Sequence, residues 1–137
     1  RVDVRRREPG LVIVLDTHAW LWLVSDPGRL GPAAIEAIDQ ADDIAVCAIS
    51  CWEIAMLVVK GRIALGLPTV EWLNSSLAGL RMTLVALDPT IATLAATLPM
   101  HGDPADRLIV ASAMSRDAPL VTKDQAIRSA GLVPTVW

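Results

Sequence analysis

The apolar residues of this chain fall into short continuous runs that alternate with longer segments of mixed polarity. A continuous apolar run is typical of a strand that is buried on both faces, as in a parallel sheet. On this pattern we predict strands over Leu11–Leu15, Ile44–Ile49, Thr83–Leu87, Leu120–Thr122 and Val133–Val136.

The segments between these runs carry signals for the start and end of helices. Pro32 and Pro68 suit the first turn of a helix, and Gly61 suits a helix stop. Ser50 is the predicted N-cap of the helix that ends before Gly61. We predict helices over Ala19–Val24, Pro32–Gln40, Trp52–Lys60, Pro68–Leu77, Pro89–Leu98, Ala105–Arg116 and Asp124–Ala130.

Strands that alternate with helices at this spacing indicate βαβ units and a parallel sheet covered on both faces. Hydrophobic residues make up 53% of the 137 residues and charged residues 20%, which excludes a disordered chain and allows one domain with a core. We expect residues 11–137 to form a single α/β domain. Residues 1–10 precede the first apolar run, and we expect them to be a disordered or artificial N-terminal extension.

The formal net charge of −3 is not the basic surplus typical of a nucleic-acid-binding protein. Clustered bases, Arg5 to Arg7 or Lys60 with Arg62, could still form a local track. No stretch is long and apolar enough to span a bilayer, and no secretory signal is evident. We therefore expect a soluble, cytoplasmic protein.

The two cysteines, Cys47 and Cys51, stand four residues apart. A zinc site would need His18 and His101 as further ligands, and this spacing matches no familiar zinc pattern. We expect both cysteines to be small buried hydrophobic residues.

Four acidic residues lie beyond apolar, strand-like runs, where an open α/β sheet builds its binding sites. Asp16 follows LVIVL, Glu53 lies a few residues after IAVCAIS, Asp106 lies in GDPADR, and Asp124 follows PLVTK. If these carboxylates converge, repulsion between like charges favours their protonation unless a cation holds them together. Mg²⁺ or Mn²⁺, which prefer oxygen ligands, would meet that need. Such a site is suited to phosphodiester hydrolysis.

Glu53 has the weakest structural explanation of the four acids. It lies in the apolar segment CWEIAMLVV, and no residue three or four positions away carries an opposite charge. A glutamate in such a segment usually needs a partner, a shifted pKa or a metal ion.

The other acids also have structural explanations, which the sequence alone leaves open. Asp16 and Asp124 could each cap the helix that follows, and Asp124 has Arg128 four residues later as an ion-pair partner. Asp103 directly precedes a proline, which is the N-cap position. Asp106 would then lie in the first helical turn, where an acid gains from the helix dipole.

Several motifs together resemble a known family. LDTHAWLW, SCWEIAMLVVKGRIAL, HGDPADRLIVASA and LVTKD follow one another between about Leu11 and the C-terminus. In this order and spacing they resemble the PIN domain, and specifically the VapC-type toxins of bacterial type II toxin–antitoxin pairs. The resemblance implies a three-layer α/β/α fold with a central, mostly parallel five-stranded sheet.

The resemblance also implies a function, that of an Mg²⁺- or Mn²⁺-dependent endoribonuclease. Its substrate would be RNA, its neutralising partner a VapB-like antitoxin, and its usual assembly a homodimer. The family's catalytic, metal-binding acids carry over to Asp16, Glu53, Asp106 and Asp124.

A further set of polar residues could support this site. Asp103 belongs to the same motif as Asp106, and Thr122 matches the small polar residue found near the fourth acid in the family. Ser50 would cap the helix that carries Glu53, and His18 could hydrogen-bond the site or touch RNA. The tryptophans could stack bases, although burial in the core or in a subunit interface is the simpler expectation. They are Trp20, Trp22, Trp52 and Trp72.

Two other function classes remain open on the sequence. A receiver-like phosphoacceptor domain also places acids around Mg²⁺, but it needs paired acids after its first strand and a lysine after a late strand. Here LDTH supplies one acid, and Lys123 is a poor substitute for that lysine. A non-catalytic binding module, whose acids are caps and surface charges, would bind no Mg²⁺.

Overall fold

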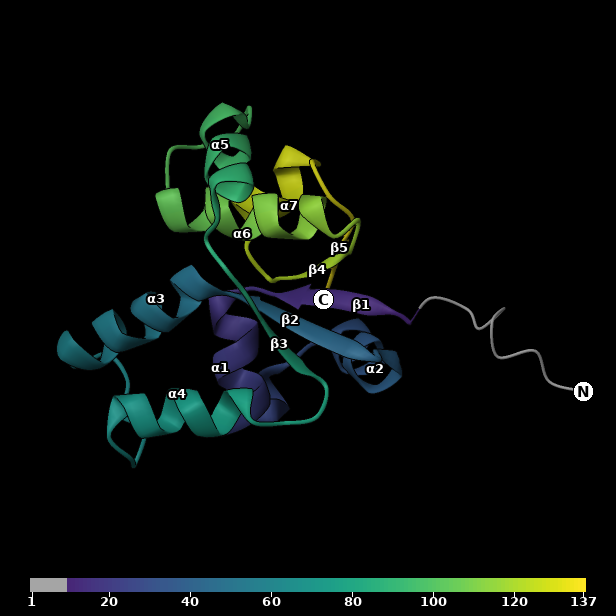
Figure 1. The fold of residues 1–137 in the computed structure, drawn as a ribbon. Coiled ribbons are helices and arrows are strands. Elements are labelled where there is room, and N and C mark those ends of the chain that lie inside the picture. Colours follow the sequence, from purple (N-terminus) through teal and green to yellow (C-terminus); the bar gives the residue numbers. More distant parts are fainter. Residues whose placement is uncertain (1–9) are drawn as a thin grey trace, which may run out of the picture.

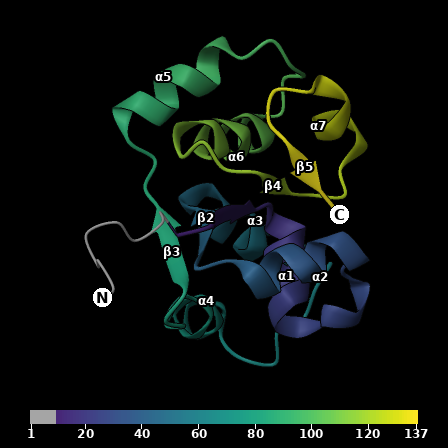
Figure 2. The same ribbon diagram turned by 90° about the vertical axis from the view of Figure 1, so that its right-hand side faces the viewer.

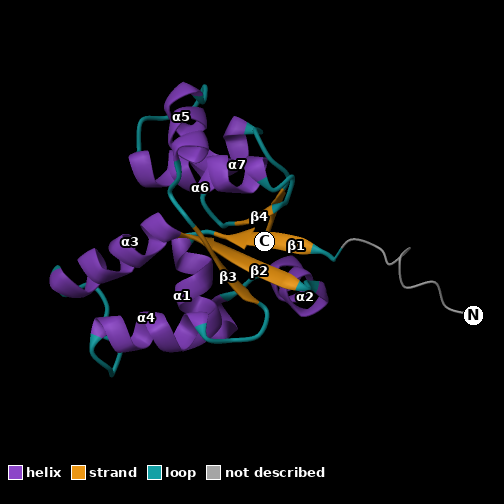
Figure 3. Ribbon diagram, viewed as in Figure 1, coloured by secondary structure: helices purple, strands orange, loops and turns teal. Residues whose placement is uncertain are grey.

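Short strands form one sheet in which every neighbouring pair is parallel (Figure 1, Figure 3). The computed structural model describes residues 10–137, so all but the last residue of the predicted N-terminal extension lies outside the described residues. The strand order is β3-β2-β1-β4-β5. The strands are β1 (Val12–Leu15), β2 (Asp43–Cys47), β3 (Met82–Val85), β4 (Leu120–Val121) and β5 (Thr135–Val136).

The helices connect these strands and cover both faces of the sheet, as the strand and helix pattern predicted (Figure 2). A short 3-10 helix over Pro27–Arg29 follows the first α-helix. The α-helices are α1 (Thr17–Ser25), α2 (Pro32–Gln40), α3 (Ala48–Val59), α4 (Thr69–Leu77), α5 (Pro89–Thr97), α6 (Pro104–Ser115) and α7 (Gln125–Ala130). The predicted strands and helices are therefore confirmed, with ends shifted by a few residues.

Side chains alternate between two cores, one on each face of the sheet. Ile13 and Leu15 of β1 pack with α1 to α4, whereas Val14 packs with α5, α6 and α7 on the opposite face. This alternation follows from the two-residue period of a strand. Trp20 and Trp72 are buried in the first core with their ring centroids 5.6 Å apart. The three layers of the predicted α/β/α fold are confirmed.

One local prediction is wrong. Ser50 is not the N-cap of α3, because β2 ends at Cys47 and the helix begins immediately at Ala48. Ser50 therefore lies inside the first turn, fully buried, and its hydroxyl is hydrogen-bonded to that of Thr17 at 2.9 Å. Trp52 lies outside the core, because it points to solvent from the helix face opposite Ser50 and Ile54 and is 58% exposed. The other predicted place for this side chain, a subunit interface, stays a prediction.

The predicted burial is confirmed for Cys47, whereas Cys51 is only partly buried, and both are free thiols. Within residues 10–137 we find no helix with the length and apolar character needed to cross a membrane.

The sheet order brings β1 and β4 together at the centre, although they lie far apart in the sequence. Val14 pairs with Leu120 and Leu15 pairs with Val121. The chain leaves β1 toward β2 on one side and leaves β4 toward β5 on the other. In open α/β sheets this reversal of direction opens a crevice outside the carboxyl ends of the strands.

Gly31, the N-cap of α2, lies directly against the last residue of the chain. The carbonyl oxygen of Trp137 accepts hydrogen bonds from the backbone N–H groups of Ala33 (3.1 Å) and Ala34 (3.3 Å). A Cβ atom at position 31 would lie 2.6 Å from the carbonyl carbon of Trp137. We expect Gly31→Ala to lower the free energy of unfolding by about 1–3 kcal/mol, measured by urea denaturation, because backbone must move to relieve the overlap.

Gly28→Ala is the matched control, since the nearest atom to a Cβ there is an Asp26 side-chain oxygen at 3.9 Å. An equal loss of stability in both variants would show that the contact with Trp137 is not the cause.

Candidate active site

One pocket, with a volume of about 410 Å³, lies at the carboxyl edge of β1 and β4. All four predicted acids line it. The lining residues are Asp16, Thr17, His18, Trp22, Glu53, Asp103, Asp106, Ile109, Lys123 and Asp124.

Asp16 is the most buried of the acids, with 9% of its surface exposed. One carboxylate oxygen accepts a hydrogen bond from the backbone N–H of Ala19 at 2.8 Å, so Asp16 is also the N-cap of α1. The other oxygen accepts a hydrogen bond from the hydroxyl of Thr122 at 2.5 Å. The pairing of Leu15 with Val121 sets this contact, because the next residues on the two strands are Asp16 and Thr122.

Thr122 links two of the acids. It is fully buried, and its hydroxyl oxygen accepts a hydrogen bond from the backbone N–H of Asp124 at 3.0 Å while it donates to Asp16. The carboxylate of Asp124 caps α7 through the N–H of Ile127 at 2.9 Å. The capping explanation for Asp16 and Asp124 is therefore correct in geometry, and both residues still face the pocket.

Glu53 lies one turn inside α3 and is partly buried. Its Oε1 accepts a hydrogen bond from the hydroxyl of Thr17, which is in turn hydrogen-bonded to the buried Ser50. Ser50 is therefore linked to Glu53 through the hydroxyl of Thr17, and it does not act as a helix cap.

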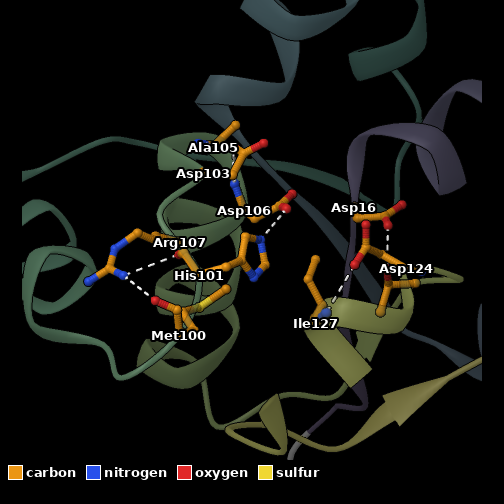
Figure 4. Close-up of polar contacts among 10 residues, drawn as sticks. Asp16, Met100, His101, Asp103, Ala105, Asp106, Arg107, Asp124 and Ile127 are labelled. Atoms are coloured by element: carbon orange, nitrogen blue, oxygen red, sulfur yellow. Dashed lines mark hydrogen bonds and ion pairs between the residues drawn. The ribbon is translucent and has the colours of Figure 1, made fainter. Parts of the chain in front are cut away.

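The sequence pattern suggested that Asp106 follows a strand, but α5 and a loop precede it instead. It reaches the pocket from the first turn of α6, where Asp103 is the N-cap and accepts from the N–H groups of Ala105 and Asp106 at 2.9 and 3.2 Å. Its Oδ2 lies 2.7 Å from Nε2 of His101 (Figure 4).

Arg107, next to Asp106, holds the loop that carries His101 (Figure 4). Its guanidinium donates to the carbonyl oxygens of Met100 at 2.8 Å and His101 at 3.2 Å, and also to three carbonyls at the end of α5. The orientation of the carboxylate at 106 is thereby tied to the end of α5.

Burial raises the pKa of Asp16, of Glu53 and of Asp106. The negative charge of Asp106 adds to the rise at the other two, and Asp103 and Asp124 add to the rise at Asp106. Hydrogen bonds from Thr122, Thr17 and His101 act in the opposite direction. The pocket therefore stores like-charge repulsion that a bound cation would relieve.

The donor set suits a hard divalent ion, because it consists of carboxylate oxygens with hydroxyls behind them. As the side chains stand, no three His, Cys, Asp or Glu groups among residues 10–137 surround one point closely enough to hold an ion. Several carboxylate oxygens accept hydrogen bonds from the protein instead. The carboxylates are therefore suitable ligands for a divalent ion, but their side chains would have to rotate before three of them could bind the same ion.

Sequence reasoning did not identify the roles of Thr17 and His101. Thr17 follows Asp16 directly, and its contact with Glu53 depends on the packing of α1 against α3. His101 precedes Asp106 in the same motif, and that closeness was the available signal. His18 is exposed at the edge of the pocket, where its ring packs on Trp22 with centroids 5.5 Å apart. Trp22 is partly exposed there.

Comparison with known proteins gives a family match over most of the chain. A model of the PIN domain family matches residues 13–132. The chain is 43% identical over 119 residues to Ribonuclease VapC22 from Mycobacterium tuberculosis, an alignment that covers 85% of this chain and 90% of the relative.

Solved structures of low sequence identity share the fold. VapBC2 from Rickettsia felis, bound to a promoter DNA fragment, matches with a TM-score of 0.68 at 15% identity, covering 91% of this chain and 97% of that one. A toxin–antitoxin complex from Klebsiella pneumoniae matches with a TM-score of 0.62 at 18% identity, covering 88% and 94%. FitAcB from Neisseria gonorrhoeae matches with a TM-score of 0.57 at 21% identity, covering 90% and 95%.

The raised pKa values lead to a prediction about stability without divalent ions. Between the ordinary aspartate pKa of 3.8 and its raised value in the folded protein, the folded state binds more protons at Asp106 than the unfolded chain does. This contribution therefore lowers the free energy of unfolding as the pH rises through that window. In EDTA we expect Asp106→Asn to be more stable than the wild type at neutral pH, with the difference shrinking toward pH 4.

Urea denaturation at several pH values measures this difference. Asp39→Asn, at an exposed position of α2 outside the pocket, is the control and should show no such trend. A difference between Asp106→Asn and wild type that stays constant with pH would contradict the electrostatic explanation.

Proposed function

This chain belongs to the PIN domain family, and from that premise we propose that it is a metal-dependent endoribonuclease, the toxin of a toxin–antitoxin pair. The observation that carries the proposal is the meeting of Asp16, Glu53, Asp106 and Asp124 in one pocket at the carboxyl edge of the sheet. The 43% identical relative, which is named a ribonuclease, supports the choice of RNA as substrate.

The four acids would hold Mg²⁺ or Mn²⁺. Such an ion, when bound, stabilises charge on a phosphate and lowers the pKa of an attacking water. The protein's own part is to position the acids. Thr122 fixes Asp16, Thr17 fixes Glu53, and His101 fixes Asp106, each through a hydrogen bond to one carboxylate oxygen.

Asp103 and Asp124, like Asp16, each cap a helix with one carboxylate oxygen. We assign Asp124 to the metal-binding set, since its second oxygen is not used in the cap and it lines the pocket. Asp103 lines the same pocket but holds two N–H groups of α6, so its part is to orient the helix turn that carries Asp106.

An antitoxin is the expected partner. The structural relatives described above include toxin–antitoxin complexes, and a basic side chain of such a partner could neutralise the acids directly. We expect the free toxin to be a homodimer that acts on RNA in the cytoplasm. Family membership favours neither a receiver-like phosphoacceptor domain nor a non-catalytic binding module.

Cleavage of total cellular RNA by the purified protein tests the function. We expect discrete fragments with Mg²⁺ or Mn²⁺ and none with EDTA. Asp106→Asn should lower the rate by on the order of a hundredfold or more, because loss of even a supporting contact at a metal site costs 10–100-fold. Cleavage that persists in EDTA or in a folded Asp106→Asn variant would rule out this site.

Thr122→Val tests the positioning of Asp16. Valine keeps the shape of threonine but removes the hydroxyl that donates to Asp16 and accepts from the N–H of Asp124. We expect the cleavage rate to fall by about 10–100-fold at saturating Mg²⁺. The control is Thr93→Val on the exposed face of α5, and an equal effect of the two substitutions would contradict this role.

A further inference from the structure

A second cavity, of about 530 Å³, adjoins the acidic pocket. The two cavities share His18 and Trp22 as lining residues, so they meet there. Arg29 and Arg62 line the second cavity, together with one acid, Asp26. We call this second cavity the basic groove. It joins a region of excess positive charge to the acidic pocket.

The indole ring of Trp22 forms cation–π contacts with two basic side chains at this junction. The guanidinium carbon of Arg29 lies 4.4 Å from the ring centroid, and Nζ of Lys123 lies 5.8 Å from it. Arg29 lines the basic groove and Lys123 lines the acidic pocket. The ring therefore holds one positive charge on each side of the junction, in positions that a flexible side chain would not otherwise keep.

The positive charges at the junction are available to a ligand. Arg29, Arg62 and Lys123 are all exposed, and within the part of the chain that the structure describes no carboxylate forms an ion pair with any of them. The whole chain has a net charge of −3, so these bases are a local concentration and not part of a generally basic surface.

A phosphodiester substrate has a particular need for such cations. The acidic pocket repels a polyanion, and binding of nucleic acid depends mainly on neutralising its phosphates with Lys and Arg. A strand that presents one phosphate to the acids and continues past His18 and Trp22 would carry its neighbouring phosphates toward Arg29 and Arg62.

We propose that the basic groove binds the RNA strand next to the phosphate that is cut, an inference that rests on the proposed ribonuclease function. Lys123 contacts the adjoining phosphate, and Arg29 and Arg62 contact the phosphates beyond it. Trp22 is a positioning residue for Arg29 and Lys123. The exposed ring of His18 offers a stacking surface for an unpaired base, which favours single-stranded RNA.

Salt-dependent binding tests the groove directly. Arg29→Ala, Arg62→Ala and the double variant are made in the Asp106→Asn background, so that the RNA stays intact. The probe is a short fluorescein-labelled single strand of mixed-sequence RNA, and anisotropy gives its affinity at several salt concentrations. Each arginine removed should reduce the slope of log K against log salt by about 0.7. Arg29→Lys should keep the slope.

Arg116→Ala is the matched control, because Arg116 is exposed at the opposite end of α6, as its C-cap, and lines neither cavity. With Asp106 restored, the arginine variants should raise KM for RNA cleavage and leave kcat nearly unchanged.

An unchanged slope in the double variant would overturn the proposal. An unchanged slope combined with weaker binding of an antitoxin would assign the groove to that partner instead, and would overturn it too. If the wild type still cleaves RNA in these cases, the ribonuclease function stands and only the groove assignment fails. If the wild type neither binds nor cleaves RNA, the proposed function fails first.

Discussion

The parallel pairing of β1 with β4 is the contact on which the site depends. It comprises two residue pairs, yet it places Asp16 beside Thr122, a residue 106 positions away in the sequence. Thr122 then joins the acid after the first strand to the backbone of the acid after the fourth. A shift of one residue in this register would turn the Thr122 side chain to the opposite face of the sheet and leave Asp16 buried without its hydroxyl partner.

The pocket concentrates negative charge, and hydrogen bonds from neighbouring side chains reduce the unfavourable free energy of burying it. Each of the three acids whose pKa is raised by burial also receives a hydrogen bond from a neighbouring side chain. These hydrogen bonds fix the orientation of the three carboxylates. Repulsion between carboxylates lowers the free energy of unfolding of the metal-free protein. A cation that binds the folded state raises it again.

The order of strands and helices could be predicted because each element carries its own local signal. The Asp103-Pro104 helix start and the continuous apolar strands are examples, and both are present in the structure. The acidic residues of the site could be predicted from the sequence, but the contacts that position them could be predicted only in part. The contact of Thr17 with Glu53 and the pairing of His101 with Asp106 depend on how α1 packs on α3 and how a loop folds back. The stacking of Arg29 and Lys123 on Trp22 joins segments that no sequence period relates.

The chain order of the site has a consequence for biosynthesis. Asp16 and Glu53 belong to elements made early, whereas Thr122 and Asp124 come after six of the helices α1 to α7 have been made. Trp137, whose ring lies edge-on to Trp22 with centroids 5.7 Å apart, follows later still. Because domains fold as their chain leaves the ribosome, a nascent protein holds an unfinished pocket until β4 can insert beside β1. The acid cluster therefore cannot be complete while the residues that precede β4 are still being synthesised.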